Sequence, residues 1–217
     1  MTKHIQNCET ILFMGDSITD CGRRTDPMGL GNGFVRLFHD LVLAQKSEID
    51  IKIINRGISG ETVVDLRKRW PMDVIEHQPD WLCLLIGIND IHTCLNKEKR
   101  AVSPEAYAQT YREIMEKTRQ ELPSCQIVLV DPFYICQPAG ADSFQKSVLR
   151  ILPAYHRTIS EMQTAFQTAR LQLHNRFAEL LQNQEAEKYC PEPVHPNATG
   201  HMVIALEIYK VLCGGKD

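Results

Sequence analysis

The chain alternates short, continuously apolar stretches with longer segments of helical periodicity along its whole length. An apolar run without polar alternation is typical of a strand buried on both faces, as in a parallel sheet covered by helices. The five stretches that meet this description are residues 10–14, 51–54, 81–86, 127–130 and 171–174. The pattern therefore predicts an α/β fold of three layers, α/β/α, built on one parallel sheet.

Helical segments separate the predicted strands. Helices are expected over residues 33–45, 62–69 (with a break at Pro71 and a further piece to about 76), 104–122, 153–169 (with a short helical piece before Pro153), 176–182 and 198–212. Residues 137–140 are expected to form a loop. No repeat, linker or low-complexity tract divides the 217 residues, so a single domain over residues 1–217 is predicted.

Charge and hydropathy exclude several classes of partner. Lys and Arg number 24 against 27 Asp and Glu, and the one basic run, Arg67-Lys68-Arg69, falls in a helical pattern and is expected to be a solvated face. Nucleic acid is therefore not an expected partner. No stretch has the apolar length of a signal peptide or a membrane span, so no membrane partner and a cytoplasmic location are expected. A homo-oligomer stays open.

The eight cysteines are even in number, which raises the question of disulfides. Cys83, Cys125 and Cys136 lie in or beside apolar runs, where cysteine behaves as a small hydrophobe. No Cys-x-x-Cys pair exists for zinc, and the eight histidines show no metal-ligand spacing. All eight cysteines are expected to be reduced thiols, and no metal site is predicted.

Four polar segments lie at strand ends or before the last helix, and the first three contain glycine: residues 15–17, 56–61, 87–90 and 192–196. In a parallel sheet the first three share one edge, and the fourth can fold back beside them. Ser17, the N–H of Gly60, the amide of Asn89 and the imidazole of His195 would then supply a nucleophile, oxyanion donors and a base for acyl transfer. Each of these residues also has a purely structural alternative, as a turn, cap or loop residue.

In order and approximate spacing these four segments resemble the four blocks of the SGNH (GDSL) hydrolase superfamily. The wording of residues 15–23, 55–62 and 87–90 is similar to the branch of acetylxylan-esterase-like carbohydrate deacetylases. The resemblance implies a flavodoxin-like sheet of five parallel strands in the order 2-1-3-4-5, and neither a metal nor an organic cofactor.

The resemblance also implies roles. Ser17 is the expected nucleophile and His195 its base, with the oxyanion held by the N–H groups of Ser17 and Gly60 and by the Asn89 amide. Where the family has an aspartate three residues before the histidine, this chain has Glu192. Glu192 is the expected catalytic acid, with Glu187 as a distant second candidate. Either the loop shifts to accommodate the longer side chain, or the acid contributes little and a backbone carbonyl orients His195. His92 either lines the pocket or lies on the surface.

The predicted function is a serine esterase that removes short acyl groups, acetyl foremost, from a sugar or oligosaccharide. A lysophospholipase or a thioesterase on the same scaffold is the alternative within enzymes. The sequence offers no long apolar helix or lid to grip a fatty chain, which favours short acyl groups. A carbohydrate-binding protein that has lost catalysis, suggested by Glu192, is the alternative outside enzymes.

Overall fold

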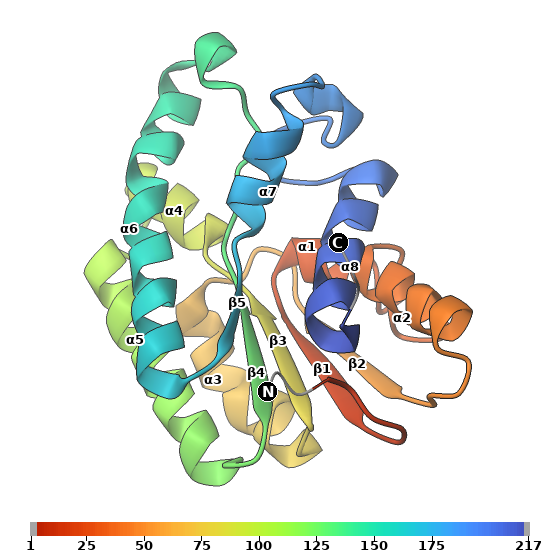
Figure 1. Cartoon of the computed structure of the whole chain (residues 1–217). Coiled ribbons are helices and arrows are strands. Elements are labelled where there is room, and N and C mark those ends of the chain that lie inside the picture. Colours follow the sequence, from red (N-terminus) through yellow and green to blue (C-terminus); the bar gives the residue numbers. More distant parts are fainter. Residues whose placement is uncertain (1–3, 215–217) are drawn as a thin grey trace.

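A five-stranded parallel sheet forms the centre of the molecule (Figure 1). The computed structural model describes residues 4–214. The strand order is β2-β1-β3-β4-β5, which confirms both the parallel sheet and the order implied by the resemblance. The strands are β1 (Thr10–Gly15), β2 (Lys52–Gly57), β3 (Trp81–Leu85), β4 (Gln126–Val130) and β5 (Ala169–Leu171).

Helices cover both faces of the sheet (Figure 1). They are α1 (Ser17–Asp20), α2 (Phe34–Gln45), α3 (Val63–Asp73), α4 (Ile88–Leu95), α5 (Pro104–Glu121), α6 (Ser143–Phe166), α7 (Leu173–Leu180) and α8 (Ala198–Cys213), with 3₁₀ turns η1 (Ile75–His77), η2 (Pro138–Gly140) and η3 (Ala186–Lys188). α2 packs against α8 on one face, and α5 packs between α3 and α6 on the other. Each crossover therefore places a helix between parallel strands, as such a sheet requires.

The core lies on both sides of the sheet. All five residues of β3 are buried, and β1 is buried from Ile11 onward, which explains why their sequences are continuously apolar. The covering helices are amphipathic, with Phe34 and Phe38 of α2 packing edge-on against Phe13 of β1. Within residues 4–214, no helix combines the length and the apolar character needed to cross a bilayer.

Two expectations about proline were wrong. Pro71 was expected to break a helix and Pro153 to open one, but both lie inside helices, α3 and α6. Pro71 falls in the last turn of α3, so its ring removes one N–H···O=C bond of the helix, and only two helical residues follow it. α6 begins ten residues before Pro153, at a capping box formed by Asp142 and Gln145. Its buried stripe continues through Leu152 and beyond, so packing outweighs the one hydrogen bond that the ring removes.

Two boundaries and one helix also differ from the expectations. The fifth strand is Ala169–Leu171 rather than residues 171–174, and α7 already begins at Leu173 rather than at Arg176. Leu173 and Phe177 are four residues apart and both buried, which is the spacing of a helix face. The residues after β3 form a further helix, α4, which was not predicted because residues 87–90 were interpreted as a polar segment at the strand end. Gly87, with a φ of +139°, makes the turn into this helix.

Candidate active site

Ser17 stands where the chain turns from β1 into α1. Asp16 caps that helix, since its Oδ1 accepts a hydrogen bond from the N–H of Ile18 at 3.1 Å. The turn is tight: a Cβ on Gly15 would lie 2.3 Å from Oγ1 of Thr19, so only glycine fits. The backbone therefore presents the half-buried serine at the carboxyl edge of the sheet.

His195 reaches the serine from the loop that precedes α8. Its Nε2 lies 2.9 Å from Oγ of Ser17, although 178 residues separate the two in sequence. Asn197 fixes the end of this loop, because its Oδ1 accepts two N–H groups from the first turn of α8 at 3.0 and 3.1 Å. Its Nδ2 donates to two carbonyl groups of η3. The loop is thus tied down on both sides of the imidazole.

Glu192 completes a chain of three side chains. Its Oε1 accepts hydrogen bonds from Nδ1 of His195 at 2.5 Å and from the backbone N–H of the same residue at 2.7 Å. Its Oε2 accepts the N–H of Val194 at 3.0 Å. A proton on Nδ1 leaves Nε2 as the acceptor for the Ser17 hydroxyl. Glu187, the second candidate, lies on η3 and lines a neighbouring hollow instead.

Gly60 and Asn89 follow the strands on either side of β1. The register aligns Gly15 at the end of β1 with Gly57 of β2 and Leu85 of β3, so the three following segments leave the sheet at one edge. Gly60 adopts a left-handed φ of +81°, and the space around its Cα is open. The structure thus brings the predicted oxyanion residues to the edge that carries the serine.

The side chain of Asn89 is anchored to the loop that contains Gly60. Its Nδ2 donates to the carbonyl oxygen of Glu61 at 3.0 Å and lies 3.5 Å from Oδ2 of Asp16. Across residues 4–214, the backbone N–H groups of Ser17 and Gly60 find no hydrogen-bond partner. Two unpaired N–H groups and an oriented amide are donors of the kind that can hold an oxyanion.

Arg69 is a residue of the site that the sequence pattern did not reveal. The run 67–69 was expected to be a solvated face, and this is correct for Arg67 and Lys68, whose side chains are 45% and 68% exposed. It is wrong for Arg69, which is only 14% exposed. Residue type alone does not distinguish the members of a charged run. The only sequence signal for the partial burial of Arg69 is its possible acidic partners, one four residues later in the same helix and one after the end of β2.

The Arg69 guanidinium joins the ends of the strands to the oxyanion loop. Its Nε donates to Oε2 of Glu61 at 2.6 Å, and its Nη1 donates to the carbonyl of Arg56 at 2.9 Å and to Oδ2 of Asp73 at 2.6 Å. Because Glu61 also holds the Asn89 amide, Arg69 supports the donor set from behind. Planar, multidentate contacts of this kind suit arginine rather than lysine.

Two buried carboxyl groups lie beneath the site. Burial raises the pKa of Asp16 to about 7, and burial likewise raises the pKa of Asp90 to about 7. Asp90 accepts the N–H of Val63 through both oxygens, at 3.1 and 3.3 Å, and so caps α3 behind the oxyanion loop. Each accepts backbone hydrogen bonds, which partly offset the cost of removing it from water.

His92 lies on α4 one turn after Asn89, half-buried rather than on the open surface. Its ring packs edge-on against Tyr134 and Phe144, with centroids 6.1 and 5.4 Å away. Burial lowers the pKa of His92, and the Glu192 carboxylate acts in the opposite direction. His92 is therefore near the triad, but it belongs to an aromatic cluster beside it.

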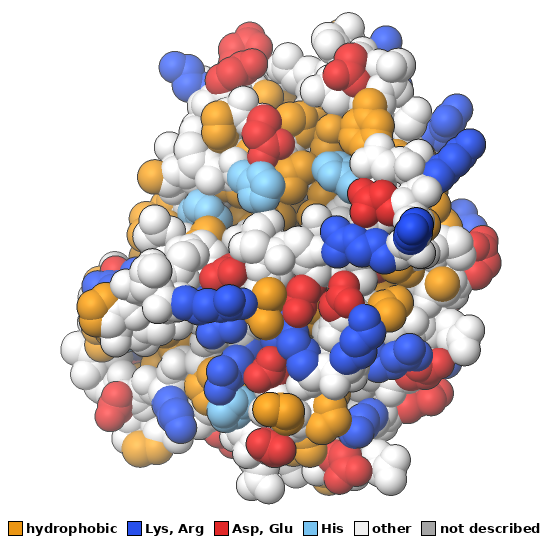
Figure 2. Space-filling view, turned by 180° about the vertical axis from the view of Figure 1, so that it is seen from behind, with side chains coloured by type: hydrophobic (Ala, Val, Ile, Leu, Met, Phe, Trp, Pro, Cys, Tyr) orange, Lys and Arg blue, Asp and Glu red, His pale blue; other side chains and the backbone are white. Residues whose placement is uncertain are grey.

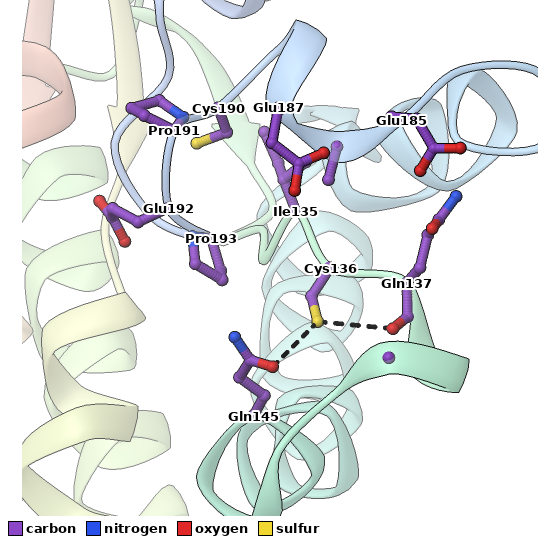
Figure 3. A pocket seen from close by; sticks show the side chains of 12 residues that line it. Ile135, Cys136, Gln137, Gln145, Glu185, Glu187, Cys190, Pro191, Glu192 and Pro193 are labelled. Carbon is purple, nitrogen blue, oxygen red and sulfur yellow. Dashed lines mark hydrogen bonds between the residues drawn. The ribbon is translucent and has the colours of Figure 1, made fainter.

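Two hollows flank the loop that carries the triad residues. One, of about 360 Å³, lies behind Glu192 between Gln137, Gln145 and Glu187 (Figure 3). The other, of about 390 Å³, contains Ser17 and His195 themselves. Figure 2 shows histidine side chains gathered among hydrophobic ones in the upper part of one face, with acidic and basic side chains intermingled below. Only the second hollow contains both ends of the Ser–His contact.

The geometry brings a serine hydroxyl, an imidazole, a carboxylate and several N–H donors into one site, and these are the kinds of group that acyl transfer uses. For the part of the chain that the structure describes, no group of three or more His, Cys, Asp or Glu side chains is arranged to hold a metal ion.

Comparison with known proteins agrees with this geometry. The model of the GDSL-like lipase/acylhydrolase family matches residues 13–203. The chain belongs to this family. The acetylxylan esterase of Geobacillus stearothermophilus is 35% identical over 206 residues, covering 91% of this chain and 90% of that protein. This GDSL protein is thus a carboxylic ester hydrolase and a homologue of an acetylxylan esterase.

Solved structures of GDSL proteins match the whole fold. A crystal structure of the same Geobacillus esterase covers 100% of this chain and 98% of its own at 32% identity, with a TM-score of 0.86. A protein from Parabacteroides merdae described as a GDSL-like lipase has 30% identity and a TM-score of 0.88, and the match covers 97% of this chain and 99% of that one. Structures of the Geobacillus esterase include catalytic mutants in which a histidine, a serine or an aspartate is replaced by alanine.

Proposed function

We propose that this GDSL hydrolase removes short acyl groups, acetyl foremost, from a carbohydrate ester through an acyl-enzyme on Ser17. The observation that carries the proposal is the continuous contact from Ser17 Oγ to His195 Nε2 at 2.9 Å and from His195 Nδ1 to Glu192 Oε1 at 2.5 Å. The catalytic mutants of the Geobacillus esterase support it, because they involve a serine, a histidine and an aspartate. Glu192 supplies the carboxylate in this chain.

The reaction begins with attack of Ser17 Oγ on the ester carbonyl carbon while its proton passes to Nε2 of His195. The negative charge on the former carbonyl oxygen is received by the N–H groups of Ser17 and Gly60 and by the Asn89 amide. Collapse of the tetrahedral intermediate releases the alcohol, which takes the proton from His195. Water then attacks the acyl-enzyme by the same route and releases the carboxylic acid and the free serine.

The openness of the site supports a substrate whose ester projects from a larger molecule. The side chains of His195 and Glu192 are 60% and 47% exposed, so an ester can approach without entering a tunnel. The names of the relatives support a carbohydrate as the alcohol part of the substrate. One relative is named an acetylxylan esterase, and further solved structures of it are named for an acetyl-xylooligosaccharide esterase. Acetylated xylo-oligosaccharides are therefore the first substrates to test.

The test compares acyl length and alcohol in one series. Rates of acid release are measured on p-nitrophenyl acetate, butyrate and octanoate beside acetylated xylo-oligosaccharides, with Ser17→Ala as the inactive control. We expect acetate to be preferred and the sugar acetate to be hydrolysed. A clear octanoate preference would assign the protein to lipid or thioester substrates, and activity in Ser17→Ala would remove the serine from the mechanism.

A further inference from the structure

Three segments of the chain bound the hollow that contains Ser17 and His195. It lies between α1, the segment 21–33 and the start of α8, and its volume is about 390 Å³. This is within the range of roughly 300–1,000 Å³ found for small-molecule sites. Gly60 and Asn89 are not among the residues that line it. It is thus a space next to the reacting atoms that does not include Gly60 and Asn89, two of the three proposed oxyanion donors.

The segment 21–33 forms one wall and is held in a single shape. The Asp26 carboxylate accepts the N–H groups of Leu30 and Gly31 at 2.8 and 3.0 Å, which closes the segment on itself. The N–H of Asn32 donates to the carbonyl of Cys21 at 2.9 Å. Gly31 has a φ of +79°, and a Cβ there would lie 2.7 Å from the same carbonyl oxygen. The wall is therefore preformed.

Cys21 and His201 form a second part of the lining, and the polar atoms of both side chains are hydrogen-bonded within the protein. The N–H of Phe34 donates to Nδ1 of His201 at 3.2 Å, so the ring proton lies on Nε2, which donates to Sγ of Cys21 at 3.3 Å. The thiol donates in turn to the carbonyl of Ile18 at 3.3 Å. Burial lowers the pKa of His201 to about 4 and raises that of Cys21 to about 12. The pair is neutral at physiological pH.

Asn32 differs from the other polar residues of the lining. Asn197 uses its side-chain amide to cap α8 and to hold η3. The exposed amide of Asn32 makes no hydrogen bond to any other residue between positions 4 and 214. No Lys, Arg, Asp or Glu lines this hollow. A ligand here therefore meets an uncharged surface and one amide that is free both to donate and to accept.

We propose that this hollow binds the alcohol portion of the ester, a neutral sugar, and that Asn32 hydrogen-bonds its hydroxyl groups. The inference rests on the proposed function and specifies which face of the site receives the sugar. A sugar hydroxyl donates and accepts at once, which matches the two ends of an amide. An anionic alcohol would lose its hydration without gaining a cationic partner, so the hollow selects for neutral sugars.

The experiment compares two acetates that differ in their alcohol. The specificity ratio, kcat/KM for acetylated xylo-oligosaccharide divided by kcat/KM for p-nitrophenyl acetate, is measured for wild type and for Asn32→Ala. The ratio should fall about 3- to 10-fold, as expected for the loss of one or two hydrogen bonds between neutral groups. Most of the change should appear in KM for the sugar ester. Asn32→Asp keeps an acceptor but loses the donor, so its specificity ratio should lie between those of wild type and Asn32→Ala.

Unacetylated xylo-oligosaccharide supplies a second readout, since it should inhibit p-nitrophenyl acetate hydrolysis competitively and more weakly in Asn32→Ala. Asn183→Ala is the matched control, because Asn183 is also exposed and lies outside the hollow; its ratio should equal that of wild type. An unchanged ratio and inhibition constant in Asn32→Ala would overturn the proposal while leaving the proposed function intact. If wild type cleaves the aryl acetate but no sugar acetate, the proposed function and this inference fail together.

Discussion

Glu192 accepts a hydrogen bond from the imidazole of His195 and another from the backbone N–H of the same residue, both through Oε1. The family has the shorter aspartate at this position, and the extra methylene adds about 1.5 Å of reach. The longer side chain of Glu192 is accommodated because it folds back over its own turn, where Oε2 accepts the N–H of Val194. A glutamate can therefore orient the imidazole from a position three residues before it.

The first prediction concerns this contact. Glu192→Ala should lower kcat by about 10²–10³, between the ~10⁴ that a fully engaged triad carboxylate supplies and the ~10² that a displacement near 1 Å costs. Glu192→Asp should lose less, provided the turn closes by the missing methylene. The measurement is kcat/KM across pH for wild type and both variants. Equal activity in wild type and Glu192→Ala would reduce the site to a Ser17–His195 dyad.

The second prediction concerns Asn89. Its amide is anchored to the carbonyl of Glu61, and we expect it to stabilise the charge that develops in the transition state rather than the core. Asn89→Ala should lower kcat by about 10²–10³ with a modest change in KM and melting temperature. Steady-state kinetics and thermal unfolding of the same preparation test this. A variant that mainly unfolds would indicate that Asn89 acts as a structural cap of α4.

The sheet and the residues at its edge could be predicted because they depend on local signals. Continuous apolar runs indicate buried parallel strands, and the polar residues that end β1 and β3 must meet at one edge once the strands are parallel. The contact of Ser17 with His195 followed from the same topology together with the family resemblance. These features need only the order of elements.

The features that could not be predicted depend on tertiary packing. Pro153 lies inside α6 because the buried stripe on both sides of it is continuous, and the proline rule does not contain this information. Arg69 is half-buried because Glu61 meets it from a loop and Asp73 meets it from its own helix. Its neighbour Arg67 has the same side chain and stays exposed, so residue type alone could not separate them.

The third prediction uses that pair as variant and control. Arg69→Met removes the contacts to Glu61, Asp73 and the carbonyl of Arg56, so the loop that bears Gly60 and anchors Asn89 loses its support. A displacement near 1 Å at the oxyanion donors would lower kcat by ~10² with little change in KM. The conservative variant Arg69→Lys should recover part of the loss.

The control is Arg67→Met, whose side chain is exposed and pairs with Glu113 at the surface. Such a pair contributes little, so activity and stability should match wild type. All variants are assayed well below their melting temperatures, which separates misplacement from unfolding. If Arg69→Met folds and retains full kcat, or if KM rises instead of kcat falling, Arg69 has no part in positioning the donors.

The fourth prediction concerns the dependence of stability on pH. Burial raises the pKa of Asp90 to about 7 in the folded protein, from an ordinary value of 3.8. Between these values the folded state holds a proton that the unfolded state has released, so the free energy of unfolding falls as pH rises. The contribution is fully present below about pH 4 and is lost as pH passes through 7. Asp16, whose pKa is also raised to about 7, acts in the same direction.

Asp90→Asn tests this without changing a side chain that touches substrate. The amide oxygen can still accept the N–H of Val63, while the group no longer ionises. The free energy of unfolding, from urea titrations between pH 4.5 and 8, should decline less steeply in the variant than in wild type, and the two should differ most at the alkaline end. The remaining slope combines Asp16, which acts in the same direction as Asp90, with the buried His174 and His201, whose pKa values burial lowers to about 4 and which act in the opposite direction below pH 6.5. Parallel curves for wild type and Asp90→Asn would mean that Asp90 ionises in the folded protein as readily as in the unfolded chain.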